Sequence, residues 1–299
     1  MTAPSVQVIK VGGSILRDAP SFERVSRLLA ARFKRHATWV VVSAAEGVTD
    51  SLSQLARDAS ATEAGSLLQL HAGLAGTDLP PFLETDLHAA RLAARWGASD
   101  RLLAWGERAS VAALHARLTR VGVTAPVVEL TVERPPEWRP HALVPGFYVR
   151  GWSGEEQCLP RGGSDLSAVW VAGALGCPSV SLWKNGGGIW TDTGSLAEIS
   201  APELLTRMAG AIRPVHWAAV WLAHQWGIDL ELMDPFGNSA STRVRARDGT
   251  TESAAPIHAH RGMPDALGHS PPARDGVTIQ TTPCELLPKD GSPPFRDLP

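Results

Sequence analysis

Short runs of β-branched and apolar residues recur along this chain, and they limit its possible folds more than any other feature. Four runs are nearly continuous in apolar character, as is typical of parallel strands that are covered on both faces of a sheet. We therefore expect them to be strands of one mainly parallel sheet. The four runs are Val6–Val11, Trp39–Ser43, Val180–Trp183 and Asp229–Met233.

Helical patterns lie between these runs. Apolar residues recur at helical spacing from Phe22 to Phe33 and from Leu166 to Ala174. Ser200-Ala-Pro-Glu203 has the form of a capping box, so we expect a helix to begin there and Pro214 to interrupt or kink it. The alternation predicts an α/β fold, a three-layer αβα sandwich with a mainly parallel central sheet. Active sites of such folds lie beyond the carboxyl ends of the strands.

Charge and composition exclude several classes of protein. Among the 299 residues, 28 are Lys or Arg and 30 are Asp or Glu, so the formal net charge of −2 argues against a general binder of nucleic acids or anionic membranes. No apolar run approaches the ~20 residues that span a bilayer. The 3 cysteines are widely spaced and no signal peptide is visible, so we expect a cytoplasmic protein without a disulfide framework or zinc site.

The first chemical motif is Lys10-Val-Gly12-Gly13-Ser14, at the end of the first expected strand. Glycines let backbone amides approach an anion closely, and a lysine adds a positive charge, so the segment suits a triphosphate. The order and spacing of a Walker A loop are absent. Taken alone, the segment also fits an ordinary strand-to-helix turn.

The second motif is Arg161-Gly-Gly-Ser164-Asp165, which leads into an expected helix. Arg161 could hold a carboxylate with two hydrogen bonds, and Asp165 could hold an ammonium group, so the segment suits a zwitterionic amino acid. A plain helix cap with a solvated arginine is the alternative interpretation.

Two weaker segments complete the set. Ser43-Ala-Ala-Glu-Gly-Val-Thr49-Asp50 follows an expected strand, and Trp105-Gly-Glu107-Arg108 lies in a helical pattern. Each alone also fits a local role, as a turn, a cap or a solvated helix face.

Together the four segments change the interpretation. From about Val6 to Val244 the chain resembles the catalytic domain of aspartokinases, because these motifs and Val144-Pro-Gly-Phe147 occur in that order and at fitting separations. The segment at Arg161 is the most specific of them. The chain is thereby identified as a member of the amino acid kinase family.

The resemblance implies that ATP phosphorylates the side-chain carboxylate of L-aspartate or a close analogue, with Mg²⁺ held mainly by the nucleotide phosphates and no metal site on the protein. Lys10 would neutralise the transferring phosphoryl group, and Arg161 would pair with a substrate carboxylate. Glu107 and Asp165 would favour its amino group. The match also carries over Ser43, Thr49, Phe147 and Ser164 around the amino acid, and Gly12, Gly13, Ser14, Lys184, Asn185, Gly188, Trp190 and Arg213 around the nucleotide.

One segment departs from the family pattern. The chain reads Lys184-Asn185 where the resemblance leads us to expect Thr-Asp. Asn185 then replaces an aspartate that orients the active-site lysines, so we expect Lys10 to be held less firmly. Lys184 adds a cation beside the nucleotide, Trp190 replaces a tyrosine near the adenine, and Arg213 replaces a lysine that faces the nucleotide.

These departures leave two hypotheses open. One is an active kinase for aspartate or another small acid in amino-acid biosynthesis. The other is a catalytically impaired relative that binds a ligand or a partner.

We expect an amino acid kinase domain over residues 1–244 and a proline-rich tail over 245–299 that is poorly ordered or docked on the core. The tail is too short for the paired ACT domains of aspartokinases, and only the stretch from Gly276 resembles a strand. Trp217, Trp221 and Trp226 cluster in one segment, and tryptophan is enriched at interfaces, so we also predict a homodimer.

Overall fold

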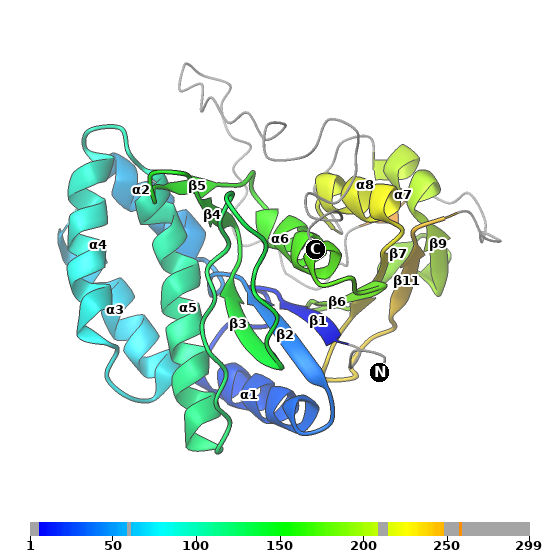
Figure 1. Cartoon of the computed structure of the whole chain (residues 1–299), viewed down its shortest axis with the longest axis horizontal. Coiled ribbons are helices and arrows are strands. Elements are labelled where there is room, and N and C mark those ends of the chain that lie inside the picture. The colour runs from blue at the N-terminus through cyan, green and yellow to red at the C-terminus, as the bar shows by residue number, and fades with distance from the viewer. Residues whose placement is uncertain (1–5, 59–60, 209–214, 248–256, 259–299) are drawn as a thin grey trace.

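A seven-stranded sheet runs through the centre of the molecule (Figure 1). The computed structural model describes residues 6–58, 61–208, 215–247 and 257–258. Along the sheet the order is β3-β2-β1-β6-β10-β11-β9. These strands are β1 (Val6–Val11), β2 (Ala37–Val42), β3 (His141–Pro145), β6 (Ser179–Trp183), β9 (Glu198–Ser200), β10 (Asp229–Met233) and β11 (Thr242–Arg245).

The sheet is mainly parallel, as the apolar runs predict. β1 pairs in parallel with both β2 and β6, and the parallel set extends to β3 on one side and β10 on the other. Only the β10–β11 pairing is antiparallel among these seven strands. All four runs that the sequence predicts as strands lie in this sheet, and the predicted α/β sandwich is confirmed.

Helices cover both faces of the sheet (Figure 1). α1 to α5 pack on one face and α6 to α8 on the other, and each face has its own apolar core. In β1, for example, Ile9 and Val11 join the first core and Val8 joins the second. The helices are α1 (Ala19–Phe33), α2 (Val48–Asp58), α3 (Ala61–Ala75), α4 (Pro81–Ala94), α5 (Asp100–Arg120), α6 (Gly163–Ala174), α7 (Ala201–Met208) and α8 (Trp217–Trp226).

Local signals explain where several helices start and end. Asp18 caps α1 by accepting a hydrogen bond from the amide of Ser21 at 2.8 Å, and Ser200 accepts one from the amide of Glu203 at the start of α7. The helix predicted at the capping box is therefore present. It ends at Met208, and Pro214, expected to interrupt it, lies outside the described residues.

Two small sheets complete the fold. β4 (Tyr148–Arg150) and β5 (Glu156–Cys158) form a hairpin between β3 and α6. β7 (Ile189–Thr191) pairs with β8 (Gly194–Leu196) and with the short β12 (Ile257–His258). The strand-like stretch predicted from Gly276 lies outside the described residues.

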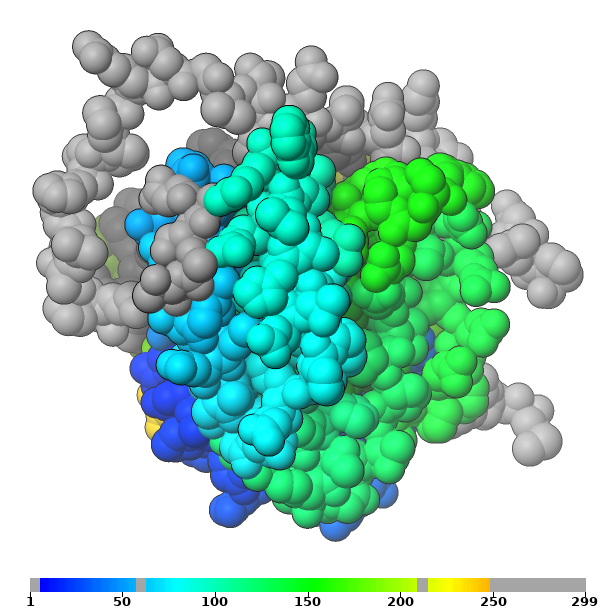
Figure 2. Space-filling view, turned by 90° about the vertical axis from the view of Figure 1, so that its left-hand side faces the viewer, coloured from blue at the N-terminus to red at the C-terminus, as the bar shows by residue number. Residues whose placement is uncertain are grey.

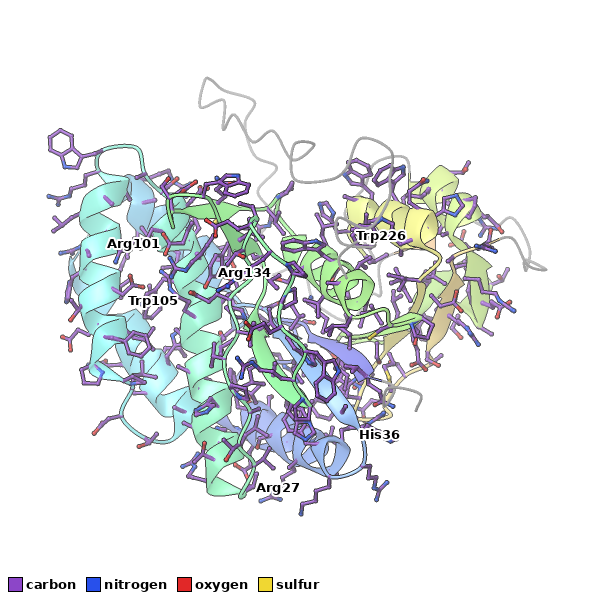
Figure 3. All side chains as sticks on the ribbon, in the orientation of Figure 1. Arg27, His36, Arg101, Trp105, Arg134 and Trp226 are labelled. Atoms are coloured by element: carbon purple, nitrogen blue, oxygen red, sulfur yellow. The ribbon has the colours of Figure 1, made fainter. Side chains whose placement is uncertain are left out.

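The three tryptophans of the predicted interface all belong to α8, but they differ in exposure. Trp226 is 8% exposed and packs against Gly173 of α6, where a Cβ would overlap its indole ring (Figure 3). Trp217 is 44% exposed. Trp226 therefore serves the core, and the homodimer stays a prediction. In the described part of the chain, no helix combines the length and apolar character needed to cross a membrane.

Candidate active site

The site lies where the order of strands reverses in the sheet. From β1 the chain continues outward to β2 and β3, whereas β6 returns to the other side of β1 and is followed outward by β10. Crevices at such reversal points, beyond the carboxyl ends of parallel strands, are the usual ligand sites of open α/β sheets. Lys10 near the end of β1 and Lys184 just after β6 meet at this point.

The turn after β1 is packed too closely for side chains. A Cβ on Gly12 would come within 2.9 Å of the carbonyl oxygen of Trp183, and one on Gly13 within 2.6 Å of that of Ala44. Gly12 also donates a backbone hydrogen bond to Trp183 at 3.0 Å. The glycine pair is thus required by close backbone approach to the end of β6 and to the segment after β2, and it brings the turn next to Lys10.

Asp165 holds both lysines. Lys10 Nζ lies 3.0 Å from Oδ1 of Asp165, and Lys184 Nζ lies 2.8 Å from Oδ2. The amide of His216 donates to the same Oδ2 at 3.2 Å. Although burial raises the pKa of Asp165, the two lysines outweigh it and hold that pKa below its ordinary value. Burial lowers the pKa of Lys184, which Asp165 partly offsets.

The sequence led us to expect Asp165 beside a substrate ammonium group, but both of its carboxylate oxygens contact lysines. Lys10, which we expected to be held less firmly because of Asn185, pairs with Asp165, and its side chain is 9% exposed. The backbone amide of Asn185 donates to the hydroxyl of Ser14 at 3.2 Å, which ties the segment after β6 to the glycine turn.

A cavity of about 260 Å³ opens beside Lys10. It joins the glycine turn after β1, the segment after β2, the middle of α5 and the start of α6. Its lining includes nine of the residues singled out in the sequence: Lys10, Gly13, Ser14, Ser43, Thr49, Glu107, Phe147, Arg161 and Ser164.

Glu107 is the buried acid of this cavity. Its Oε1 accepts a hydrogen bond from the amide of Ala44 at 3.0 Å, while its buried Oε2 has no partner among the described residues. Burial raises the pKa of Glu107 from 4.5 to about 8, and the hydrogen bond from Ala44 and the charge of Lys10 only partly oppose this shift. The side chain is therefore mostly protonated at neutral pH, and its Oε2 is open to a ligand.

Arg161 lies at the mouth of the cavity and is 67% exposed. Its Nη2 lies 2.7 Å from Oδ1 of Asp50, which belongs to α2 and is also exposed. An exposed ion pair of this kind contributes little to stability, so a competing carboxylate can replace Asp50 at small cost.

The backbone just before the β4–β5 hairpin is strained and tightly packed. Phe147, just before β4, has a φ of 70° and is the one residue other than glycine in the left-handed region among the described residues. Its amide donates to the hydroxyl of Ser167 at 3.1 Å. A Cβ on Gly146 would press on Ser164 at 2.8 Å. These contacts fix the hairpin against α6.

Other residues from the sequence lie elsewhere. Gly188 packs against Thr242 and Ala240, and the indole nitrogen of Trp190 donates to the carbonyl of Gly186 at 3.2 Å. Neither lines the cavity, and Arg213 is outside the described residues.

Three further residues join the site without being singled out as candidates from the sequence. Asp50 pairs with Arg161. The hydroxyl of Ser110 accepts a hydrogen bond from the amide of Ala45 at 2.9 Å, and the backbone amide of His216 donates to Asp165. Asp50 is the last residue of the Ser43–Asp50 segment, so that segment could have indicated it as a site residue.

Comparison with known proteins gives consistent relatives. Aspartokinase from Thermus thermophilus is 27% identical over 268 residues, which cover 80% of this chain and 58% of that protein. Aspartokinase from Rickettsia felis is 23% identical over 256 residues, which cover 82% of this chain and 62% of that protein. The chain thus spans about six tenths of the length of these relatives.

Solved structures share the fold. E. coli aspartokinase III in complex with aspartate and ADP matches with a TM-score of 0.68 at 20% identity, over 81% of this chain and 65% of that one. Aspartate kinase from Clostridium acetobutylicum matches with a TM-score of 0.66 at 18% identity, over 81% and 62%. The model of the amino acid kinase family matches residues 5–234. This chain therefore belongs to the amino acid kinase family.

Proposed function

We propose that this protein transfers a phosphoryl group from ATP to the side-chain carboxylate of L-aspartate or a close amino-acid analogue, giving an acyl phosphate. One observation carries the proposal: a single cavity joins Lys10 and the glycine turn to Arg161 and Glu107. The names of the relatives support it, since they are aspartokinases and one solved relative holds aspartate and ADP.

The lysine end of the cavity suits phosphates. Lys10, paired with Asp165, places a fixed positive charge beside the backbone amides of the glycine turn, and Lys184 shares the same carboxylate. Charge that is already in place when the phosphoryl group moves stabilises the transition state without reorganisation. Asp165 would act as the residue that positions both lysines.

The arginine end suits a zwitterionic amino acid. Arg161 would exchange the exposed Asp50 for a carboxylate of the substrate, in a charge-assisted bond of similar geometry. Glu107 would give up its proton when an ammonium group approaches its unpartnered oxygen. No general base is needed, because the attacking side-chain carboxylate is already ionised near neutral pH.

Mg²⁺ would neutralise phosphate charge, held mainly by the nucleotide. Both oxygens of Asp165 face lysines, and the described part of the chain contains no group of three or more His, Cys, Asp or Glu side chains arranged to hold a metal ion. Asp165 is engaged by the lysines, so we propose the nucleotide phosphates as the main ligands of the metal.

An assay of ADP release with a panel of amino acids and small acids tests the proposal. Hydroxylamine in the same reaction converts an acyl phosphate into a hydroxamate, which identifies the carboxylate as the acceptor. We expect release of ADP and formation of hydroxamate with aspartate or a close analogue.

A second candidate is a catalytically impaired protein that binds the amino acid, favoured by the change to Lys184-Asn185. If aspartate binds in calorimetry but none of the acids causes ADP to be released from ATP, that candidate is established and the kinase is rejected.

A further inference from the structure

Two neighbouring residues of α5 face different parts of the molecule. Glu107 lines the site cavity, whereas Arg108 lines a groove between α4, α5 and the β4–β5 hairpin. Figure 2 shows this side of the molecule, with the hairpin in green beside α4 in cyan. The side chain of Arg108 is only 10% exposed, and a charge buried to this degree is normally paired. Its partners therefore show what it holds together.

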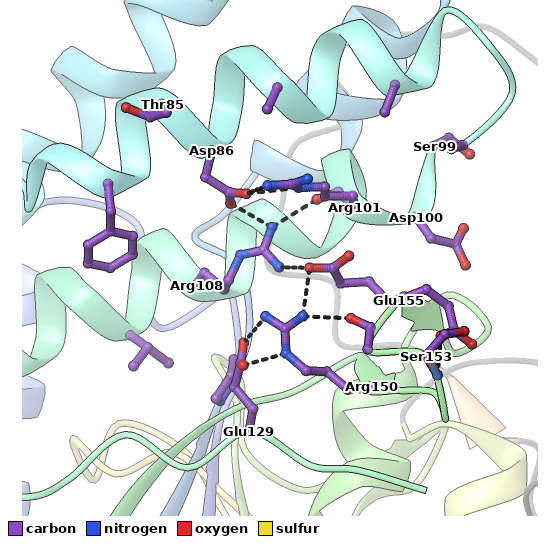
Figure 4. A pocket seen from close by; sticks show the side chains of 18 of the residues that line it. Thr85, Asp86, Ser99, Asp100, Arg101, Arg108, Glu129, Arg150, Ser153 and Glu155 are labelled. Carbon is purple, nitrogen blue, oxygen red and sulfur yellow. Dashed lines mark hydrogen bonds and ion pairs between the residues drawn. The ribbon is translucent and has the colours of Figure 1, made fainter.

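Arg108 joins α5 to both of its neighbours at once. Its Nη2 lies 2.7 Å from Asp86 of α4 (Figure 4), and its Nη1 lies 2.8 Å from Glu156 of β5. The same Nη2 donates to the carbonyl of Arg101, near the start of α5, at 3.1 Å. A guanidinium carries its donors in a rigid fork, so one side chain can pair with two carboxylates that come from different elements.

Arg108 also contacts both strands of the hairpin. Its guanidinium lies 5.6 Å from the centre of the ring of Tyr148 in β4, and its ion pair with Glu156 reaches β5. Glu156 pairs in addition with Arg150 of β4, at 3.3 Å. β4 and β5 have 3 residues each, and an isolated two-stranded hairpin is at best marginally stable. The hairpin therefore depends on contacts such as these for its position on α5.

Both ends of the hairpin lead into the site cavity. Phe147 comes directly before β4 and lines the cavity, and Arg161 follows β5 through Leu159 and Pro160 and lies at the mouth. The amide of Leu159 donates to the carbonyl of Phe147 at 2.7 Å, which joins the two ends. A shift of the hairpin on α5 would therefore change the distances from Phe147 and Arg161 to Glu107.

From these contacts we propose that Arg108 is a positioning residue for the amino-acid end of the cavity. Arg108 holds the hairpin on α5 through Glu156, and the hairpin in turn places Phe147 and Arg161 around the ligand. This role rests on the proposed function, which supplies the amino acid as the ligand. The lysine end of the cavity is held by Asp165 and is independent of this ion pair.

A double-mutant cycle on the ion pair tests the proposal. Arg108→Gln and Glu156→Gln each remove one charge and keep a polar side chain. We expect each to raise the KM for the amino acid ~10-fold, the effect of one charge-assisted contact, with kcat and the KM for ATP within ~2-fold. Because both changes break the same contact, the double variant should show the same ~10-fold rise. Additive effects, a rise of ~100-fold in the double variant, overturn the proposal.

Arg101→Gln is the matched control. Arg101 lies 2.8 Å from the same Asp86, and its ion pair in the described part of the chain joins α5 to α4 instead of to the hairpin. We expect its KM values and kcat to stay unchanged. An equal rise in the amino-acid KM with Arg101→Gln would mean that any loosening of α4 on α5 disturbs the site, and it overturns the proposal. Thermal melting checks that each variant is folded.

Hydrogen exchange measured by mass spectrometry tests the hairpin without using activity. The backbone amides of residues 148–158 should exchange at least ~10-fold faster in Arg108→Gln than in the unmodified chain, and no faster in Arg101→Gln. Unchanged exchange in Arg108→Gln overturns the proposal. If the unmodified chain releases no ADP with any acid, the proposed transfer fails by itself, and the calorimetric Kd for aspartate takes the place of KM in the same cycle.

Discussion

The two ends of the site cavity treat charge in opposite ways. At the lysine end, Lys10 and Lys184 share one buried carboxylate, and each charge has a partner within 3.0 Å. At the arginine end, Arg161 is exposed, and the buried Glu107 keeps one oxygen without a partner among the described residues. The first end is organised by the protein alone, whereas the second gains its strongest contacts only when a ligand arrives.

Removal of the shared carboxylate should have the largest effect. Asp165→Asn removes the carboxylate that Lys10 and Lys184 share, and removing one partner of a buried ion pair costs about 3–5 kcal/mol. We expect a lower unfolding midpoint in urea and a fall in ADP release of at least ~10³-fold. A variant that remains folded and retains more than a tenth of the rate would show that Asp165 does not position the lysines for catalysis.

Removal of the arginine should have a smaller effect, confined to substrate binding. Arg161→Ala deletes one charge-assisted contact worth about 1.5–3 kcal/mol, so we expect the KM for the amino acid to rise ~10–100-fold with little change in stability. The control is Asp50→Ala, which frees Arg161 and should lower KM slightly. A rise in KM with Asp50→Ala would mean that Asp50 itself holds the substrate.

The pH dependence of stability tests the buried acid. The pKa of Glu107 is raised from 4.5 to about 8, so between these values the folded state binds more protons than the unfolded state. The contribution of Glu107 to the free energy of unfolding therefore falls as pH rises through this window. Above the window it destabilises the folded state by a few kcal/mol, because each unit of pKa shift corresponds to about 1.4 kcal/mol.

Urea unfolding measured from pH 5 to pH 8 checks this dependence, with Glu107→Gln as the comparison. The variant should lose that slope. An identical slope in both proteins would place the titration on another group.

The smallest effect is expected at the position that departs from the family pattern. Asn185→Asp would add a charge where the resemblance led us to expect one, but the lysines already share Asp165. We expect ADP release to change by less than ~3-fold, below 1 kcal/mol in activation free energy. A large gain in rate would show that the site has decayed at this position and that Asp165 does not compensate.

The same contrast separates what sequence can predict from what it cannot. The apolar runs predicted the parallel sheet, because burial on both faces leaves its mark on consecutive residues of each strand. The Gly12-Gly13 turn was found for a similar reason, since close packing against Trp183 and Ala44 excludes every side chain.

Long-range charge pairing leaves no comparable local mark. Asp165 was predicted to hold a substrate ammonium group from its own carboxylate and from the resemblance, but the distances between two strand ends and a helix start decide which groups it meets. Arg161 and Asp50 are likewise 111 positions apart. Only the folded chain shows that these residues are within reach of each other.

The pairing of β1 with β6 also has a consequence for how the protein is made. Until β6 has left the ribosome, one edge of β1 is unpaired, and Lys10 and Lys184 cannot share Asp165. N-terminal segments fold first during synthesis, and pairing between distant strands is slow. The nascent chain therefore exposes an apolar strand edge during this interval, and the lysine end of the site cannot form before Lys184 has been synthesised.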